Sequence, residues 1–242
     1  MMPKYLLIFA LVLFATPLFA KPTTGHHGMV STAHPKATEA GVAMLRLGGN
    51  AADAAAAAAF ALAVVEPYSS GIGGGGFALT HFDGKQAFLD FREVAPQKAH
   101  RDMYIQDGKP NNILSRDGIL SVAVPGAVAG YLQLQEQFGT LTRQQVLAPA
   151  IALATDGFAV TPRYIGYVER RLELLQQDPE ISRIFLVASD TGKFVAPKVG
   201  HQVQQPDLAQ TLHLIAQKGA SVFYSGSVAQ KLVEDIQARN GI

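Results

Sequence analysis

A run of small apolar residues from Ala51 to Val65 restricts the possible folds of this chain more than any other segment. Asn50 before the run is a good helix N-cap and Pro67 after it ends a helix, so the run predicts a single helix. Asp53 is its one charged residue, and a helix that is apolar on every side belongs in the interior of a fold. A membrane span is the alternative, but Asp53 and the shortness of the run argue against it.

Further helices and one hairpin are predicted around this interior helix. Asp83-Gly84 separates two apolar runs and predicts a hairpin with strands over 77–82 and 85–91, so that Arg92 lies where the second strand ends. Capping residues, helix breakers and apolar spacing also predict a short strand over 29–32 and a polar surface excursion over 102–118. The same signals predict helices over 35–47, 126–138, 142–156, 161–175 and 207–218, and a last helix through 228–236. The helix over 142–156 is expected to be interrupted at Pro149, and the helix over 207–218 to be capped by Asp207.

Composition excludes several classes of protein. The 242 residues are 48% hydrophobic and 16% charged, which excludes a disordered chain and a coiled coil. Lys and Arg total 20 against 19 Asp and Glu, and no basic stripe is visible, so no nucleic-acid partner is expected. The sequence contains no cysteine, which excludes a disulfide scaffold, a Cys-ligated metal site and a cysteine nucleophile.

Residues 1–20 have the pattern of a signal peptide. Lys4 precedes an apolar stretch over 5–15, and Pro17 precedes the small residue Ala20. We expect cleavage after Ala20, export to the periplasm or the medium, a flexible mature N-terminus over 21–27, and a domain over 28–242 with no stable membrane span. An uncleaved membrane anchor is the alternative, which the short apolar stretch disfavours.

The glycine-rich segment that follows the interior helix does not predict a nucleotide site. Gly71, Gly73 and Gly76 satisfy G-x-G-x-x-G, but here a helix precedes the motif and a strand follows it, the reverse of a dinucleotide-binding fold. We interpret the glycines as a place where the backbone passes close to another element or exposes N–H groups to a ligand. The pair His26-His27 lies beside the expected cleavage site and does not predict a metal site.

Arg92 is the remaining candidate for chemistry. A guanidinium at a strand exit, next to a glycine-rich loop, can bind a carboxylate through two parallel hydrogen bonds. The alternative is a surface ion pair with Asp90 or Glu93, and the residue types alone favour that alternative.

At these residues the chain resembles the large subunit of the γ-glutamyltransferase (γ-glutamyltranspeptidase, glutathione hydrolase) family. The segments that carry the resemblance, in the family's order, are LGGNAADA at 47–54, VEP at 65–67, SSGIGGGGF at 69–77, LDFREVAP at 89–96, SVAVPG at 121–126, LAPAI at 147–151 and ASVFYSG at 220–226. No single segment is specific, but the ordered set is, and it covers the chain from Gly28 to Ile242.

The resemblance implies an α+β fold, the αββα sandwich of the N-terminal-nucleophile hydrolases, of which this chain is expected to hold only a large-subunit portion. Members are exported precursors that cut themselves into two subunits; a threonine at the new N-terminus attacks a γ-glutamyl amide such as that of glutathione. The acyl group then passes to water, an amino acid or a peptide. No cofactor is implied. The arginine that matches Arg92 grips the α-carboxylate of the γ-glutamyl group, which reverses the preference for a surface pair.

One departure from the family pattern accompanies the match. The Thr-Thr-His-Phe-like stretch that carries the nucleophile has no counterpart here, since Thr23-Thr24 lies at the wrong end and Thr161 begins a helix. We therefore expect the catalytic threonine beyond Ile242, a partner small subunit from the same precursor, and no activity of this chain alone. The alternatives are a related cephalosporin or glutaryl acylase, and a noncatalytic remnant or module that pairs with a separate small subunit.

Overall fold

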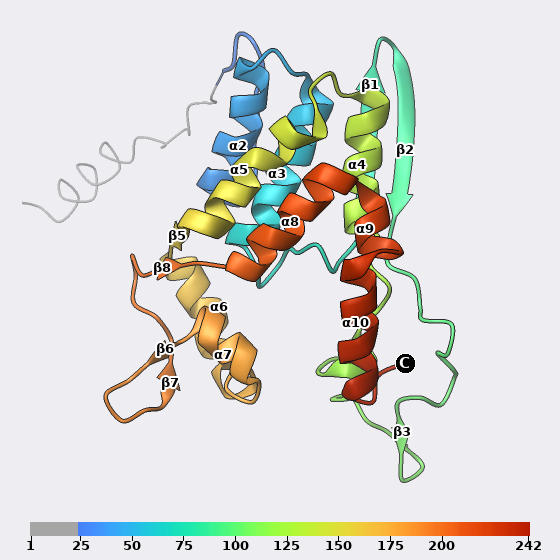
Figure 1. Cartoon of the computed structure of the whole chain (residues 1–242), viewed down its shortest axis with the longest axis vertical. Helices are drawn as coiled ribbons and strands as arrows, with labels where there is room; N and C mark the ends of the chain where they lie inside the picture. The colour runs from blue at the N-terminus through green and yellow to red at the C-terminus, as the bar shows by residue number, and fades with distance from the viewer. Residues whose placement is uncertain (1–23) are drawn as a thin grey trace, which may run out of the picture.

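A computed structural model describes residues 24–242 of the chain (Figure 1). The expected signal peptide over 1–20, its cleavage after Ala20 and the first residues of the expected mature N-terminus lie outside the described residues. Residues 24–34, which include His26 and His27, have no helix or strand. The predicted strand over 29–32 is therefore wrong. Val30 instead packs against the hydrophobic core, with its Cγ1 atom close against Gly41.

The predicted interior helix is confirmed as α3, Ala51–Val65. Asn50 Oδ1 accepts the Ala52 N–H at 2.8 Å, and Asp53 Oδ2 accepts the Asn50 N–H at 3.0 Å, so the two side chains cap the helix reciprocally. Phe60 and Val64 are fully buried, as expected for a helix without a polar face.

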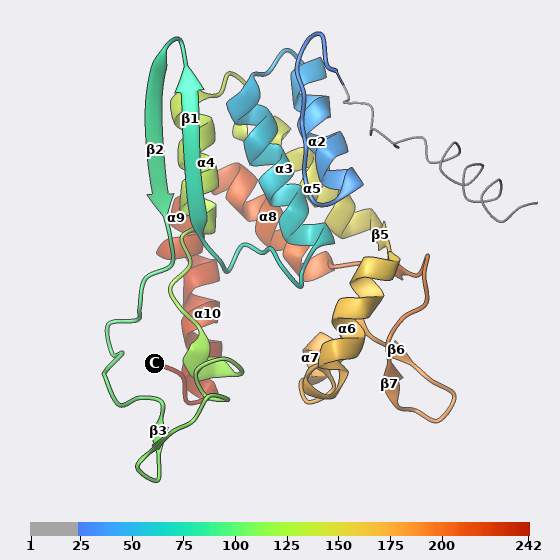
Figure 2. The same cartoon turned by 180° about the vertical axis from the view of Figure 1, so that it is seen from behind.

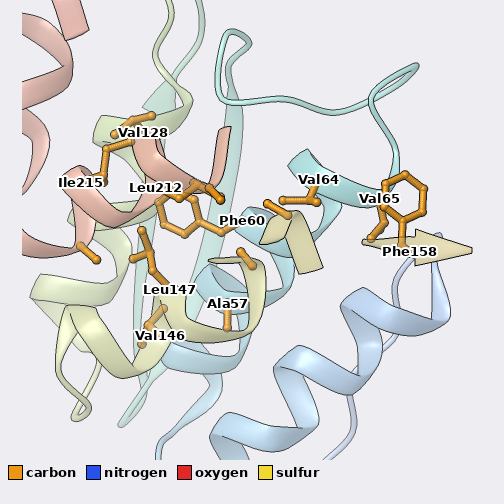
Figure 3. Packing of buried hydrophobic residues seen from close by; sticks show 14 of the residues in the cluster. Ala57, Phe60, Val64, Val65, Val128, Val146, Leu147, Phe158, Leu212 and Ile215 are labelled. Atoms are coloured by element: carbon orange, nitrogen blue, oxygen red, sulfur yellow. The ribbon is translucent and has the colours of Figure 1, made fainter. Parts of the chain in front are cut away.

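Helices α2 (Pro35–Arg46) and α5 (Arg143–Asp156) pack on α3, and α8 (Pro206–Lys218) packs on α5. Figure 3 shows where α3, α5 and α8 meet, with Leu147 of α5 and Leu212 of α8 around Phe60. All three side chains are 0% exposed. The small alanines of α3 allow this close packing because they add little volume between the backbones.

Two predictions about helix ends and breaks are corrected here. α5 runs without interruption through Pro149, because the buried residues Val146, Leu147 and Ala150 around the proline hold the helix against α3 and α8. α8 begins at Pro206 after Gln205, so Asp207 lies in the first turn and is not the cap. The Gln205 side chain is buried and donates to the Val64 carbonyl at 2.8 Å, and this contact places the start of α8.

The predicted hairpin is confirmed as β1 (Gly76–Phe82) and β2 (Lys85–Phe91), paired antiparallel with Phe82 opposite Lys85. Asp83 and Gly84 have φ of 51° and 75°, the conformation of the two-residue turn that matches the twist of the strands. One face of the hairpin packs on α4 (Ala127–Phe138), and both lie at the edge of the molecule in Figures 1 and 2.

The remaining elements complete the fold, and several of them, such as α6, α7 and α10, lie below this body in Figure 1. Their bounds are β3 Ile105–Gln106, β4 Lys109–Pro110, the 3₁₀ helix η1 Ile119–Ser121, β5 Phe158–Ala159, α6 Pro162–Leu175, α7 Pro179–Phe185, β6 Val187–Ala188, β7 Phe194–Val195, β8 Gln202–Val203, α9 Ala220–Tyr224 and α10 Ser227–Ala238. The strands pair as β3-β4, β5-β8 and β6-β7. The surface excursion over 102–118 is confirmed as turns around β3 and β4.

The expected fold class, α+β with an incomplete sandwich, is confirmed by the layers of the chain. Helices cover one face of the long hairpin, whereas Phe77, Leu79 and Phe88 on the other face are 56%, 79% and 62% exposed. Over residues 24–242 every sheet has two strands, so the described part supplies one helix layer and one narrow strand layer. Within that same part, no helix is both long and apolar enough to cross a membrane.

Candidate functional site

Arg92 follows directly after β2, as predicted, and the residues on either side of it are held in place. On one side, the Phe91 ring lies against α4 at Gly130, where an added Cβ would come within 2.0 Å of Phe91 Cγ. On the other side, Val94 exchanges two backbone hydrogen bonds with Val124, of 3.2 and 2.9 Å. The strand exit therefore presents Arg92 from a fixed backbone.

The glycine-rich segment packs against this strand exit. A Cβ on Gly75 would come within 2.5 Å of the Phe91 carbonyl oxygen and 2.7 Å of the Glu93 nitrogen, so only glycine fits there. The Gly74 carbonyl oxygen accepts the N–H groups of Gly126 and Ala127, both at 2.9 Å. Close approach to another element, one of the two interpretations of this segment, therefore accounts for Gly75, whereas a Cβ on Gly73 would meet nothing within 4 Å.

The Arg92 side chain is 68% exposed. The sequence left two roles for it, binding of a carboxylate ligand and a surface ion pair with Asp90 or Glu93. Its Nε lies 3.4 Å from Glu93 Oε2, so a surface pair with Glu93 exists. Asp90 is used differently: its Oδ1 accepts the backbone N–H of Arg92 at 3.0 Å. Because the guanidinium stays largely exposed, the ion pair leaves donors free for a further partner.

Glu93 is the residue whose importance sequence reasoning missed. Its Oε2 is buried and accepts no hydrogen bond among the described residues, although a buried carboxylate oxygen ordinarily has a donor. Burial, together with the nearby Glu93 carboxylate, raises the pKa of Tyr131 above its ordinary value. The burial of this oxygen depends on the packing of distant segments, so the local sequence carries no signal for it beyond a carboxylate next to Arg92.

Arg92 and Glu93 border a cleft of about 670 Å³. The other residues that line it are Gly73, Val94, Ala95, Pro96, Ala99, Met103, Tyr104, Leu120, Ser121, Val122 and Ala123. Tyr104 Oη donates to the Leu120 carbonyl at 3.2 Å and ties the two walls together. A cleft with one cation, one carboxylate and mostly apolar walls suits a small molecule that carries both charges.

The remaining candidates lie away from this cleft. Thr161 Oγ1 accepts the Tyr164 N–H at 3.3 Å and caps α6, as predicted. Within residues 24–242 no three His, Asp or Glu side chains are grouped as metal ligands, and His26 and His27 are exposed. Among the residues that the structure describes, neither threonine nor histidine lines the Arg92 cleft.

Comparison with known proteins gives a consistent result. The family model described as gamma-glutamyltranspeptidase matches residues 37–242. A glutathione hydrolase proenzyme from Pseudomonas sp. (strain A14) is 42% identical over 223 residues, covering 91% of this chain and 38% of the relative. An acylase ACY 1 proenzyme from Pseudomonas sp. (strain V22) is 40% identical over 232 residues, covering 92% of this chain and 40% of the relative.

The solved structure of Helicobacter pylori gamma-glutamyltranspeptidase superposes with a TM-score of 0.86 at 38% identity, covering 92% of this chain and 63% of the solved chain. This chain spans about two fifths of the length of the two curated relatives. The match covers the helix layer, the hairpin and the Arg92 cleft together, because it extends over nearly all of the described residues. The chain belongs to the γ-glutamyltranspeptidase family.

Proposed function

We propose that this chain is the substrate-recognition portion of an exported γ-glutamyltransferase or glutathione hydrolase. The observation that carries the proposal is the exposed Arg92 guanidinium at the mouth of the cleft, on a backbone held at Phe91 and Val94. It binds the α-carboxylate of a γ-glutamyl group through two parallel hydrogen bonds. Family membership and the proenzyme names of the relatives support this assignment.

Glu93 completes the recognition of an amino-acid head group in this proposal. Its Oε2 accepts no hydrogen bond and has only the 3.4 Å ion pair with Arg92 Nε, so the α-ammonium of a γ-glutamyl group would add a partner to this carboxylate. Arg92 binds the α-carboxylate, and the negative charge of Glu93 beside it suits the α-ammonium of the same head group. An acyl group that carries a carboxylate but no ammonium is disfavoured, because it leaves Glu93 without a cationic partner from the ligand.

The chemical step is assigned to a threonine N-terminal nucleophile on a small subunit from the same precursor. Its α-amine acts as the base, and its hydroxyl oxygen attacks the γ-amide carbonyl to form an acyl-enzyme with release of the amine. The relatives are longer than this chain by enough to carry such a subunit. The exposed hairpin face with Phe77, Leu79 and Phe88 offers the apolar surface that a second strand layer would cover.

Binding of L-glutamate to the chain tests the role of Arg92. We expect Arg92→Lys to weaken binding about tenfold, because an ammonium cannot reproduce the planar fork of the guanidinium. Affinity is measured by NMR titration. The matched control is Arg101→Lys, whose side chain lies just before the excursion, is 96% exposed and lines no part of the cleft. Equal affinity of Arg92→Lys and the parent chain, or no binding by the parent chain, contradicts the proposal.

A related acylase is the second candidate, favoured by the 40% identity to the acylase ACY 1 proenzyme. The same titration separates the two, because glutarate carries both carboxylates of glutamate but no ammonium. Preference for L-glutamate that is lost in Glu93→Gln supports the γ-glutamyl assignment. Preference for glutarate supports the acylase.

A further inference from the structure

Helix α4 begins without a side-chain cap, and two distant segments satisfy its first amide groups. Its N-cap residue, Gly126, has no side chain to offer. The Gly126 and Ala127 N–H groups donate to the Gly74 carbonyl, and the Ala129 N–H donates to Tyr224 Oη at 3.1 Å. The first turn of a helix carries four such amides without internal partners, so these acceptors fix where α4 starts.

The same first turn of α4 also holds the strand exit that carries Arg92. The preceding residue Val124 pairs with Val94, and Gly130 receives the Phe91 ring. Gly74, which caps α4, lies next to Gly75 against the Phe91 carbonyl. A displacement of the start of α4 therefore moves Phe91 and Val94, which flank Arg92 and Glu93.

Tyr224 is well placed to prevent such a displacement. It ends α9, and the two residues before it, Val222 and Phe223, are each only 4% exposed in the core. The Phe223 and Tyr224 rings meet edge to face at 5.1 Å. Burial raises the pKa of Tyr224, although the Ala129 N–H opposes the change, so the phenol is neutral near pH 7 and acts as an uncharged acceptor.

We infer that Tyr224 is a positioning residue for substrate binding: its hydroxyl fixes the start of α4 and, through Phe91 and Val94, aims Arg92 into the cleft. The inference rests on the proposed function for its link to the substrate carboxylate. The coupling between Tyr224 and Arg92 can be measured without substrate.

The test compares Tyr224→Phe, which removes only the hydroxyl, with Tyr164→Phe. Tyr164 Oη donates to the Phe185 carbonyl at 3.4 Å between α6 and α7, so this control also loses one hydroxyl contact, remote from the cleft. In ¹⁵N-labelled chain we expect Tyr224→Phe to shift the backbone signals of Gly74 and Val94 and the Nε–H signal of Arg92. That last signal is assigned by its loss in Arg92→Lys. Tyr164→Phe leaves all three in place.

L-Glutamate titration of the same samples gives the second measurement. We expect about a fivefold rise in Kd for Tyr224→Phe and no change for Tyr164→Phe, with the melting temperature of each variant recorded alongside. If Tyr224→Phe lowers the melting temperature but leaves the Arg92 signal in place, its role is only structural and the inference is overturned. If the Arg92 signal moves but the parent chain does not bind L-glutamate, the coupling is supported and the proposed function fails.

Discussion

Asp53 illustrates how much a single side chain contributes to this fold. It is the one charge in α3 and is 0% exposed. Its carboxylate accepts the N–H groups of Asn50, Thr140 and Leu141 at 3.0, 2.9 and 3.2 Å. Burial alone would raise the pKa of Asp53, but these hydrogen bonds outweigh it and lower the pKa. Asp53 thereby joins the start of α3 to the connection between α4 and α5.

A second buried residue, His34, makes stability depend on pH. Its Nδ1 accepts the Lys36 N–H at 3.2 Å as the N-cap of α2. Burial lowers the pKa of His34 below 6.5, and the nearby charges of Lys36 and Arg163 lower it further, while the Glu66 and Glu39 carboxylates oppose the change.

Because the folded state excludes a proton that the unfolded state binds, stability is fully present above pH 6.5 and falls as the pH drops below it. We expect His34→Asn, which keeps a capping side chain but does not titrate, to flatten this dependence. Urea unfolding at pH 7.5 and pH 5.5 gives the comparison. An equal loss of unfolding free energy in both proteins would assign the pH effect to other groups.

At the scale of elements, α4 and the hairpin are joined by contacts that only small residues permit. Their packing fixes the end of β2 and therefore the position of Arg92, the next residue. Gly130 in α4 is the critical position, since a Cβ there would lie 2.0 Å from Phe91 Cγ and 2.4 Å from Phe91 Cδ1. Glycine is therefore required at position 130 by the lack of space between α4 and β2, and not by the backbone conformation.

Gly130→Ala is expected to destabilise the chain by about 1–3 kcal/mol, because the Phe91 ring must move away from α4. Gly166→Ala is the matched control: Gly166 is also inside a helix, α6, but a Cβ there meets nothing within 4 Å. This control should gain up to about 1 kcal/mol from helix propensity. The free energy of unfolding from urea titration distinguishes the two variants. Similar values would mean that the Phe91 ring moves away from α4 without loss of stability.

At the scale of the whole molecule, the described chain has a well-packed interior but exposes apolar side chains, among them two groups on regular elements. One is the outer hairpin face, where Phe77 and Phe88 stack at 5.6 Å. The other is on α10, where Leu232 and Val233 are 42% and 50% exposed. Contiguous apolar surface of this kind marks an interface or a liability to aggregate.

The chain is therefore expected to bind a hydrophobic dye while folded. Leu79→Ser combined with Phe88→Ser should reduce the dye fluorescence by about half, since it removes most of the hairpin patch. Leu232→Ser with Val233→Ser is the control for α10 and should leave the hairpin contribution intact. Fluorescence titration at matched protein concentration provides the measurement, with circular dichroism to confirm folding. Loss of signal only in the α10 variant would place the exposed surface there.

The sequence by itself determined those features whose causes are local. The capped interior helix, the hairpin with Asp83-Gly84, the cap at Thr161 and the position of Arg92 after a strand all follow from patterns within a few residues. The ordered motifs also identified the family. The strand over 29–32 and the break at Pro149 failed because local tendencies there are weaker than packing against α2, α3 and α8.

Only the tertiary structure decided what surrounds Arg92. The buried oxygen of Glu93, the cleft closed by Tyr104 and Leu120, and the capping of α4 by Tyr224 join segments that are distant in the chain. Such contacts leave no periodic pattern, because each partner satisfies a different local preference. Their geometry is set when the hydrophobic core brings α3, α4, α8 and α9 together, and the candidate site depends on that packing.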